Sequence, residues 1–143
     1  MPTRFYKAVG QVAGGLFLGA TMKIAFATDD LLTISAHLGR AQKFLVVTLD
    51  DAGQVVDREP RDKPAHGQHH DHHDHSHSGH FHDSMASVIP DCDFVVARGM
   101  GRPAFAGMQA AGIEPLLTDI ATINNAVAAW QAGELINHPE RAH

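Results

Sequence analysis

Cysteine is nearly absent from this chain of 143 residues. The one cysteine, Cys92, cannot form a disulfide within a single chain, and a cluster held only by the cysteines of one chain is excluded too. A single cysteine fits a reducing compartment, so we expect a cytoplasmic protein. Asp91 and Asp93 flank Cys92 and should raise the pKa of its thiol. We therefore predict a buried, unreactive cysteine, with a ligand shared between two chains as the alternative.

Basic residues are fewer than acidic ones, because 11 lysines and arginines stand against 16 aspartates and glutamates, giving a formal net charge of −5. Nucleic-acid binding needs a basic face, so we predict no nucleic-acid partner. Long apolar runs are missing as well. The weakly apolar stretch at residues 8–20 is interrupted by glycines and is too short to span a membrane, so no membrane partner is predicted.

Residues 1–21 allow two interpretations. Arg4 and Lys7 precede the apolar stretch, and small residues at 18–20 resemble the cleavage site of a weak signal peptide. Met22 is followed at once by a strand-like run, which favours a disordered extension or an over-long reading frame instead. We expect the latter, followed by one domain at residues 22–136 and a polar, frayed tail at residues 137–143.

Catalytic motifs are missing. The chain has no Ser–His–acid order, no carboxylate pair in apolar surroundings and no P-loop. Asp29 and Asp30 are the only acidic residues suitably placed at a strand end for a nuclease. We therefore predict that the protein is not an enzyme.

Five segments have the composition of β-strands. The first four are apolar or rich in valine and leucine, and they are expected at Lys23–Thr28, Phe44–Asp50, Val55–Glu59 and Phe94–Ala97. The fifth is expected at Ile113–Thr118. Gly53 should take a positive φ in a hairpin turn between the second and third strands, and Pro60 should end the third.

Three helices are expected between and after these strands, at Ser84–Ile89, Pro103–Ala111 and Ile120–Gln131. Gly112 and Gly133 should end the last two. The last helix has one apolar face, formed by Ile123, Ala126, Val127 and Trp130. This order predicts an α/β fold with a mixed five-stranded sheet and helices on its faces.

A polar loop after the first strand is the first candidate site, and it carries Ser35, His37, Gly39 and Arg40. An imidazole can bind a transition metal through one nitrogen, and a planar guanidinium can neutralise an anionic ligand. The alternative is that His37 hydrogen-bonds the backbone and Arg40 is an ordinary surface charge.

A second candidate lies between the fourth strand and the following helix, at Gly99, Met100 and Gly101. Glycines let the backbone approach a ligand, and N–H groups at a helix start attract anions. The alternative is a tight turn that needs positive φ, with Met100 in a packing role.

A histidine-rich segment at residues 66–82 is the strongest chemical signal in the chain. Imidazoles at this density suit zinc, nickel, cobalt or copper, and the glycines and serines between them predict a loop that becomes ordered when metal binds. The candidate metal ligands are His66, His69, His70, His72, His73, His75, His77, His80 and His82.

Four ordered landmarks resemble a known family. They are MKIAFATDD, ISAHLGRAQKFLVVTLD, DFVVARGMGRPAFAGMQAAGIEPLL and a closing helix that ends in GEL. From Met22 to about Leu135 they are similar to the dinitrogenase iron–molybdenum cofactor biosynthesis family, of the NifX and NifB C-terminal type. This resemblance implies a ribonuclease-H-like α/β fold and the binding of iron–sulfur or iron–molybdenum clusters. It places the family's loop histidine on His37 and its glycine turn on Gly99 and Gly101.

Three functions are therefore compared. The first is a non-catalytic carrier of cluster intermediates that meets cluster-assembly or acceptor proteins, as in nitrogen fixation. The second is a divalent-metal buffer or chaperone that acts through the histidine-rich loop. The third is a regulatory module that binds an anion or nucleotide at the glycine turn.

Overall fold

A computed structural model describes residues 21–63 and 85–143 of the protein. The five predicted strands are confirmed within a few residues, as β1 (Met22–Thr28), β2 (Lys43–Leu49), β3 (Val55–Asp62), β4 (Phe94–Ala97) and β5 (Glu114–Leu117). They form one mixed sheet in the order β3-β2-β1-β4-β5. The pairs β2–β3 and β1–β2 are antiparallel, whereas β1–β4 and β4–β5 are parallel. The mixed five-stranded sheet is therefore confirmed, and its ribonuclease-H-like character stays a prediction.

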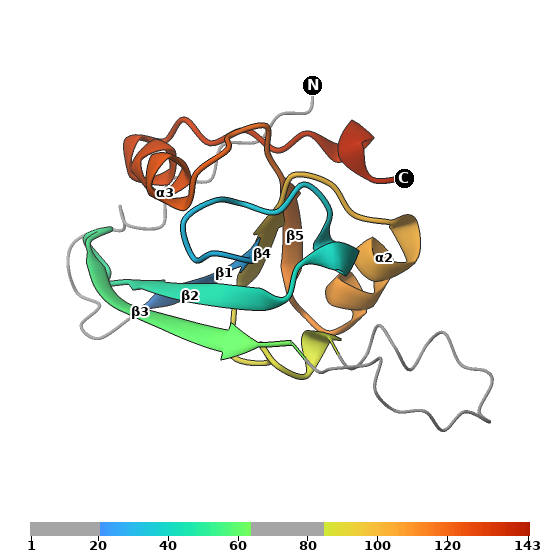
Figure 1. Ribbon diagram of the computed structural model, residues 1–143. Coiled ribbons are helices and arrows are strands. Elements are labelled where there is room, and N and C mark those ends of the chain that lie inside the picture. Colours follow the sequence, from blue (N-terminus) through green and yellow to red (C-terminus); the bar gives the residue numbers. More distant parts are fainter. Residues whose placement is uncertain (1–20, 64–84) are drawn as a thin grey trace.

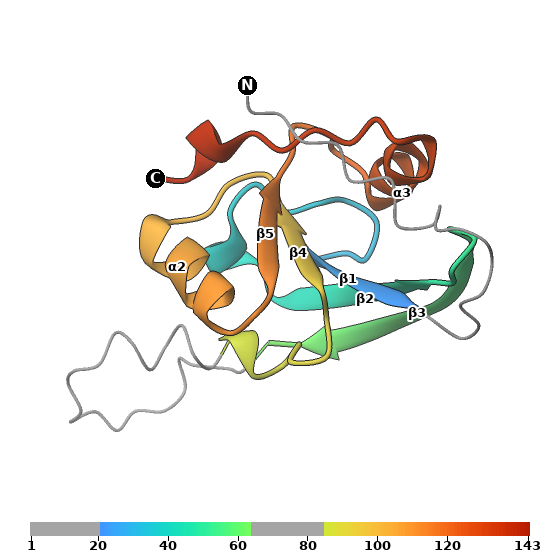
Figure 2. The same cartoon turned by 180° about the vertical axis from the view of Figure 1, so that it is seen from behind.

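Helices cover both faces of the sheet (Figures 1 and 2). Side chains alternate along β1, so Ala25 and Ala27 face helix α2 (Arg102–Ala110), whereas Ile24 and Phe26 face helix α3 (Ile123–Ala132). The predicted apolar face of α3 is buried over all four of its residues. Two apolar clusters result, one on each side of the sheet.

The ends of both helices follow from local chemistry. Thr122 caps α3, because its hydroxyl accepts a hydrogen bond from the N–H of Asn125 at 3.2 Å, so this helix starts three residues later than predicted. Gly133 ends α3 with a φ of 77°. Gly112 follows α2 with a φ of 84°, and Pro103 lies in its first turn, both as predicted.

Three local predictions are corrected. Pro60 does not end β3 but lies within it, opposite Leu45, because β3 is an edge strand of the sheet and, among the described residues, no strand pairs with its outer side. Only part of the helix predicted at Ser84–Ile89 is present: Ser84 lies outside the described residues, Met85 and Ala86 are helical, and turns follow from Ser87 onward. Residues 137–143 are not frayed but pack through hydrogen bonds and contain a 3-10 helix, η4 (Pro139–Arg141).

Residues 1–20 and the whole histidine-rich segment at 66–82 lie outside the described residues, so the predictions made for them stay predictions. In the part of the chain that is described, no helix is both long enough and apolar enough to cross a membrane.

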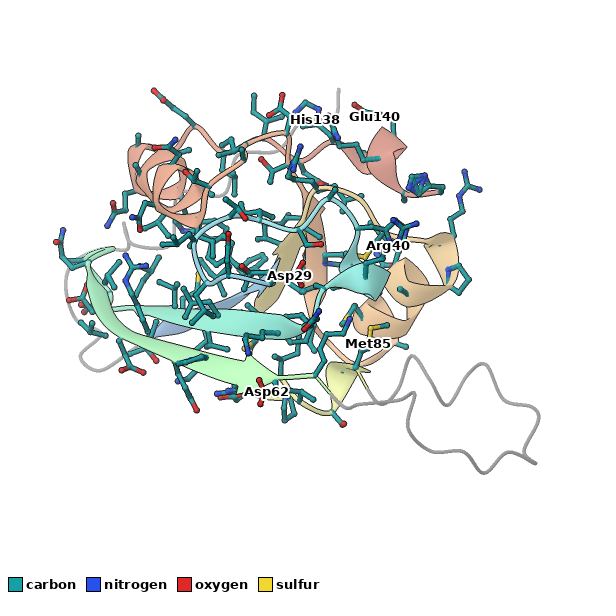
Figure 3. The ribbon with its side chains drawn as sticks, viewed as in Figure 1. Asp29, Arg40, Asp62, Met85, His138 and Glu140 are labelled. Atoms are coloured by element: carbon teal, nitrogen blue, oxygen red, sulfur yellow. The ribbon has the colours of Figure 1, made fainter. Side chains whose placement is uncertain are left out.

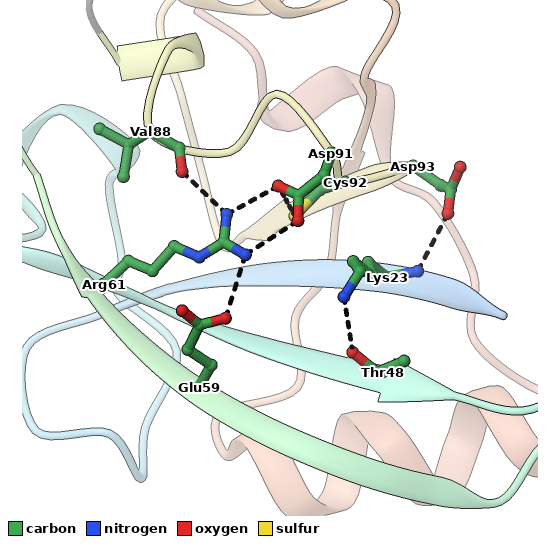
Figure 4. A network of polar contacts seen from close by, with 8 residues as sticks. All are labelled: Lys23, Thr48, Glu59, Arg61, Val88, Asp91, Cys92 and Asp93. Carbon is green, nitrogen blue, oxygen red and sulfur yellow. Dashed lines mark hydrogen bonds and ion pairs between the residues drawn. The ribbon is translucent and has the colours of Figure 1, made fainter.

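An arginine clasp joins the two chain segments that flank the histidine-rich insertion (Figure 4). The Arg61 guanidinium at the end of β3 donates to both carboxylate oxygens of Asp91, at 2.7 and 2.9 Å, and to the carbonyl of Val88 at 2.9 Å. Glu59 accepts a fourth bond at 3.1 Å. This bidentate geometry lowers the pKa of Asp91 from 3.8 to about 2, chiefly through the hydrogen bonds from Arg61.

We expect Arg61→Met and Asp91→Asn each to destabilise the fold, with a coupling of about 1 kcal/mol in a double-mutant cycle, because the Asp91 side chain is 43% exposed. Because the folded pKa of Asp91 is lowered, the contribution should be complete above about pH 4 and lost as the pH falls towards 2. Urea unfolding of the four proteins at pH 7 and pH 3 tests this. A coupling near zero at pH 7 would show that the clasp is only a surface contact.

Candidate functional site

The candidate site lies where the chain leaves the parallel strands β1 and β4 in opposite directions. After β1 the chain turns towards β2, and after β4 it passes through α2 to β5, so the carboxyl ends of these two strands form a topological switch point. Ser35 bridges the ends of these two strands, since its N–H donates to the carbonyl of Ala27 at 2.7 Å and its carbonyl accepts from the N–H of Arg98 at 3.0 Å. The N–H of Leu38 then donates to the carbonyl of Gly99 at 2.9 Å. The two predicted site segments, 35–40 and 99–101, are thus side by side.

Asp29 and Asp30 shape the loop that carries this site. One carboxylate oxygen of Asp30 accepts from the N–H groups of Leu32 and Thr33, at 2.9 and 2.8 Å, and these bonds lower its pKa to about 2. Asp29 accepts from the N–H of Gln42 at 2.8 Å. Both carboxylates are thus used as acceptors for backbone N–H groups.

His37 caps the short 3-10 helix η3 (Leu38–Arg40). Its Nδ1 accepts a hydrogen bond from the N–H of Gly39 at 3.2 Å, and the Ser35 hydroxyl holds its backbone through bonds of 2.9 and 3.2 Å. A nitrogen that accepts from a backbone N–H carries no proton, so the neutral ring must carry its proton on Nε2. His37 therefore both binds the backbone and presents an N–H group. Gly39 and Arg40 beside it are exposed.

His143 packs against His37, a contact that no pattern in the sequence indicates. The two imidazole rings are stacked at 5.5 Å between centroids and 14° between planes. Burial lowers the pKa of His37, and the positive charges of His143, Arg40 and Lys63 lower it further. The ring of His37 therefore stays neutral to a lower pH than a free histidine.

Lys63 is a second residue that sequence reasoning missed. Its ammonium donates to the carbonyl of Leu38 in η3 at 2.8 Å, from a half-buried position just before the histidine-rich insertion. Burial lowers the pKa of Lys63 from 10.5 to about 8, and the nearby Asp29 carboxylate opposes this shift.

The glycine turn is explained by close contact and not by positive φ. Neither Gly99 nor Gly101 is among the described glycines with positive φ, so the tight-turn alternative is wrong. A Cβ on Gly99 would lie 2.9 Å from the carbonyl oxygen of Ala36, whereas a Cβ on Gly101 would meet only Pro103 at 3.6 Å. Met100 is fully buried in the cluster under α2, which agrees with its predicted packing role.

Cys92 is also buried, at 4% exposure. Burial, and then the Asp91 carboxylate, raise its pKa to about 12, so the predicted inert thiol is confirmed, with burial as the larger cause.

Within residues 21–63 and 85–143, no three histidine, cysteine, aspartate or glutamate side chains are grouped to hold a metal ion. His37 is thus the one predicted metal ligand that falls within these residues. Figure 3 shows Arg40 of the same loop on η3.

A sequence model of a family described as dinitrogenase iron-molybdenum cofactor matches residues 20–133. Comparison with curated proteins gives no match. Among solved structures, a protein of Methanocaldococcus jannaschii that is provisionally classed as a dinitrogenase has a TM-score of 0.61 at 15% identity, over 85% of this chain and 97% of that chain. The apo form of the orange protein from Desulfovibrio gigas has a TM-score of 0.60 at 23% identity, over 85% and 96% of the two chains. At this identity the likenesses show a shared fold.

Gly99→Ala should destabilise the protein by about 1–3 kcal/mol, because its methyl group would overlap a backbone oxygen that cannot rotate away. Gly101→Ala is the matched control and should be neutral or stabilise by roughly 0.5 kcal/mol, since its φ is −72° and the space is open. Chemical unfolding of both variants measures the difference. Equal effects of the two substitutions would contradict the close contact.

Lys63 should make stability increase with pH above about 8. Between about pH 8 and 10.5 the folded protein has released this proton whereas the unfolded chain still holds it, so the unfolded state binds more protons. The free energy of unfolding of wild type minus that of Lys63→Met should therefore rise across this range. Cys92 acts in the opposite sense but is present in both proteins and cancels. If this difference in the free energy of unfolding does not change with pH, the folded protein does not lower the pKa of Lys63.

Proposed function

This chain belongs to the dinitrogenase iron–molybdenum cofactor family, and on that basis we propose that it binds and carries iron–sulfur or iron–molybdenum cluster intermediates without catalysing a reaction. The cluster is the cargo of the protein. The proposed binding surface consists of the loop from Ser35 to Arg40 and the neighbouring turn at residues 99–101. Cluster-assembly and acceptor proteins are the expected partners.

The observation that carries this proposal is a local concentration of positive charge in an acidic protein. Arg40 and Lys63 both lie close enough to His37 for their charges to lower its pKa, although the formal net charge of the chain is −5. Iron–sulfur and iron–molybdenum clusters are anionic, and such a positive patch attracts and holds an anion. The planar, exposed guanidinium of Arg40 is suited to the rim of such a site.

The tautomer of His37 specifies how the side chain contacts the cargo. With Nδ1 occupied by the N–H of Gly39, the free nitrogen is a donor, which suits a hydrogen bond to a sulfide or carboxylate of the cluster. Direct coordination of a metal through Nε2 would move the proton to Nδ1 and break the bond to Gly39. We therefore assign to His37 the role of a donor to the outside of the cluster.

The solved orange protein supports a ligand-binding role for the fold. Its structure is described as an apo form, which means that the orange protein also has a form with a bound ligand. By analogy, we propose a loaded and an unloaded state for this chain too.

A divalent-metal buffer is the second candidate function, because one flank of the histidine-rich insertion hydrogen-bonds η3 and the other packs into the apolar cluster to which η3 contributes Leu38. Lys63, one residue before the undescribed segment 64–84, hydrogen-bonds Leu38, and Met85, one residue after it, belongs to the same apolar cluster as Leu38. The third candidate, an anion or nucleotide at the glycine turn, has less support, because a lone Gly-x-Gly lacks the third glycine of a dinucleotide fingerprint.

We expect His37→Ala to lower uptake of iron–sulfur cluster or of isolated iron–molybdenum cofactor under anaerobic conditions, because it removes the Nε2 donor and the cap of η3 together. His37→Asn is the matched control for stability, since asparagine can keep the cap but has no group at the position of Nε2. Bound iron and molybdenum per chain, with the cluster's absorption spectrum, give the readout. Both variants should lose uptake, and the His37→Asn variant should retain more stability. Full uptake by a folded His37→Ala variant would contradict the assigned site.

Deletion of residues 66–82 separates the two leading functions. Cluster uptake should survive the deletion, whereas binding of zinc or nickel in a calorimetric titration should be lost. If cluster uptake disappears together with zinc binding while the deletion variant stays folded, the histidine-rich segment and not the His37 loop is the site of the cargo.

A further inference from the structure

Residues 141–143 lie along the glycine turn and pair with it through an isolated parallel β-bridge between Met100 and Ala142. The N–H of Met100 donates to the carbonyl of Arg141 at 3.4 Å, the N–H of His143 donates to Met100 at 2.9 Å, and the N–H of Arg102 donates to His143 at 3.2 Å. Both views of the ribbon show this end of the chain beside the start of α2 (Figures 1 and 2). Residues 141–143 thus occupy the backbone donors that the sequence pattern suggests for an anionic ligand.

The side chain of His143 also covers His37, which is the other half of the proposed cargo site. Its ring stacks on the ring of His37, and its Nε2 lies 3.6 Å from the position that a Cβ on Gly99 would take. The imidazole of His143 therefore fills the space between the two halves of the proposed cargo site. A ligand that contacts both His37 and the backbone of Gly99 must take the place of this ring.

The contacts of this segment with the turn are of the kind that a ligand can replace. Two of the three backbone bonds are long for N–H···O bonds, at 3.4 and 3.2 Å, and His143 is exposed. Residues further back are held more firmly, because the N–H of His138 donates to Leu117 at 2.7 Å and the amide oxygen of Asn137 accepts from Leu117 at 2.9 Å. Release can therefore be confined to residues 141–143, which are the last residue of η4 and the two residues after it.

We propose that residues 141–143 are an internal occupant of the cargo site, which an anionic cluster displaces when it binds. This inference rests on the proposed function. Acceptor atoms of the cluster would replace the carbonyls of Arg141 and His143 on the N–H groups of Met100 and Arg102, and the body of the cluster would replace the His143 ring beside His37. Because the cargo and the segment use the same donors, each weakens the binding of the other. Return of the segment then assists delivery of the cargo to an acceptor.

Removal of the occupant should strengthen cargo binding. A chain that stops after Glu140 should bind isolated iron–molybdenum cofactor with an apparent Kd lower by about threefold to tenfold, since the competent state is no longer only a fraction of the molecules. His143→Ala should give part of this gain, and Glu140→Gln, which leaves residues 141–143 in place, is the matched control. In the full chain, hydrogen exchange of the His143 amide should accelerate when the cofactor is added, while circular dichroism shows an intact fold.

The outcomes separate this inference from the function on which it rests. Unchanged or weaker binding by the shortened chain, with normal binding by wild type that His37→Ala abolishes, would overturn the occupant and show that His143 is neutral or a co-ligand. Binding by the shortened chain alone would support the occupant strongly. If neither the wild type nor any variant binds the cofactor or a reconstituted iron–sulfur cluster, the proposed function fails and the occupant fails with it.

Discussion

The backbone of Ser35 is the joint on which this site depends. It bridges the carboxyl ends of β1 and β4 through its bonds to Ala27 and Arg98, and so it holds together two loops that the strand order sends in opposite directions. This arrangement brings the carbonyl of Ala36 so near to Gly99 that no side chain fits there. Glycine at position 99 is thus required by the crossing of two backbones, and the positions of His37 and of the turn follow from this crossing.

The charges of nearby side chains then determine which ligands the site can attract. The loop uses its acidic groups, Asp29 and Asp30, internally as acceptors for backbone N–H groups, which leaves the basic groups directed at the space around His37. Burial lowers the pKa of Lys63 and of His37 below their values in water, so part of the positive charge at this site depends on pH. An acidic protein can in this way present a cationic patch without becoming basic overall.

The strands, the buried face of α3 and the two helix-ending glycines can be predicted, because each depends on residues close together in sequence. His37 and Gly99 can be proposed as neighbours only through resemblance to a family, since about sixty residues separate them and no local pattern links them. Lys63 and His143 escape prediction for the same reason. The polar neighbours of His143 predict a frayed tail, and the backbone bonds that hold it to Met100 leave no mark on composition. Pro60 is predicted wrongly because the sequence does not reveal which strand lies at an edge.

The Arg61 clasp has a consequence for how such a chain can evolve. By fastening Asp91 to the end of β3, it closes the insertion at its base, and the hydrogen bonds described for it are made to residues outside 64–84. The entropy of closing a loop changes only slowly with its length, roughly 0.6 kcal/mol for each doubling. The tract between the two anchors is therefore free to lengthen, shorten or change its composition without disturbing the sheet. A histidine-rich appendage of this kind can be acquired, tuned or lost by a lineage while the domain that carries it stays the same.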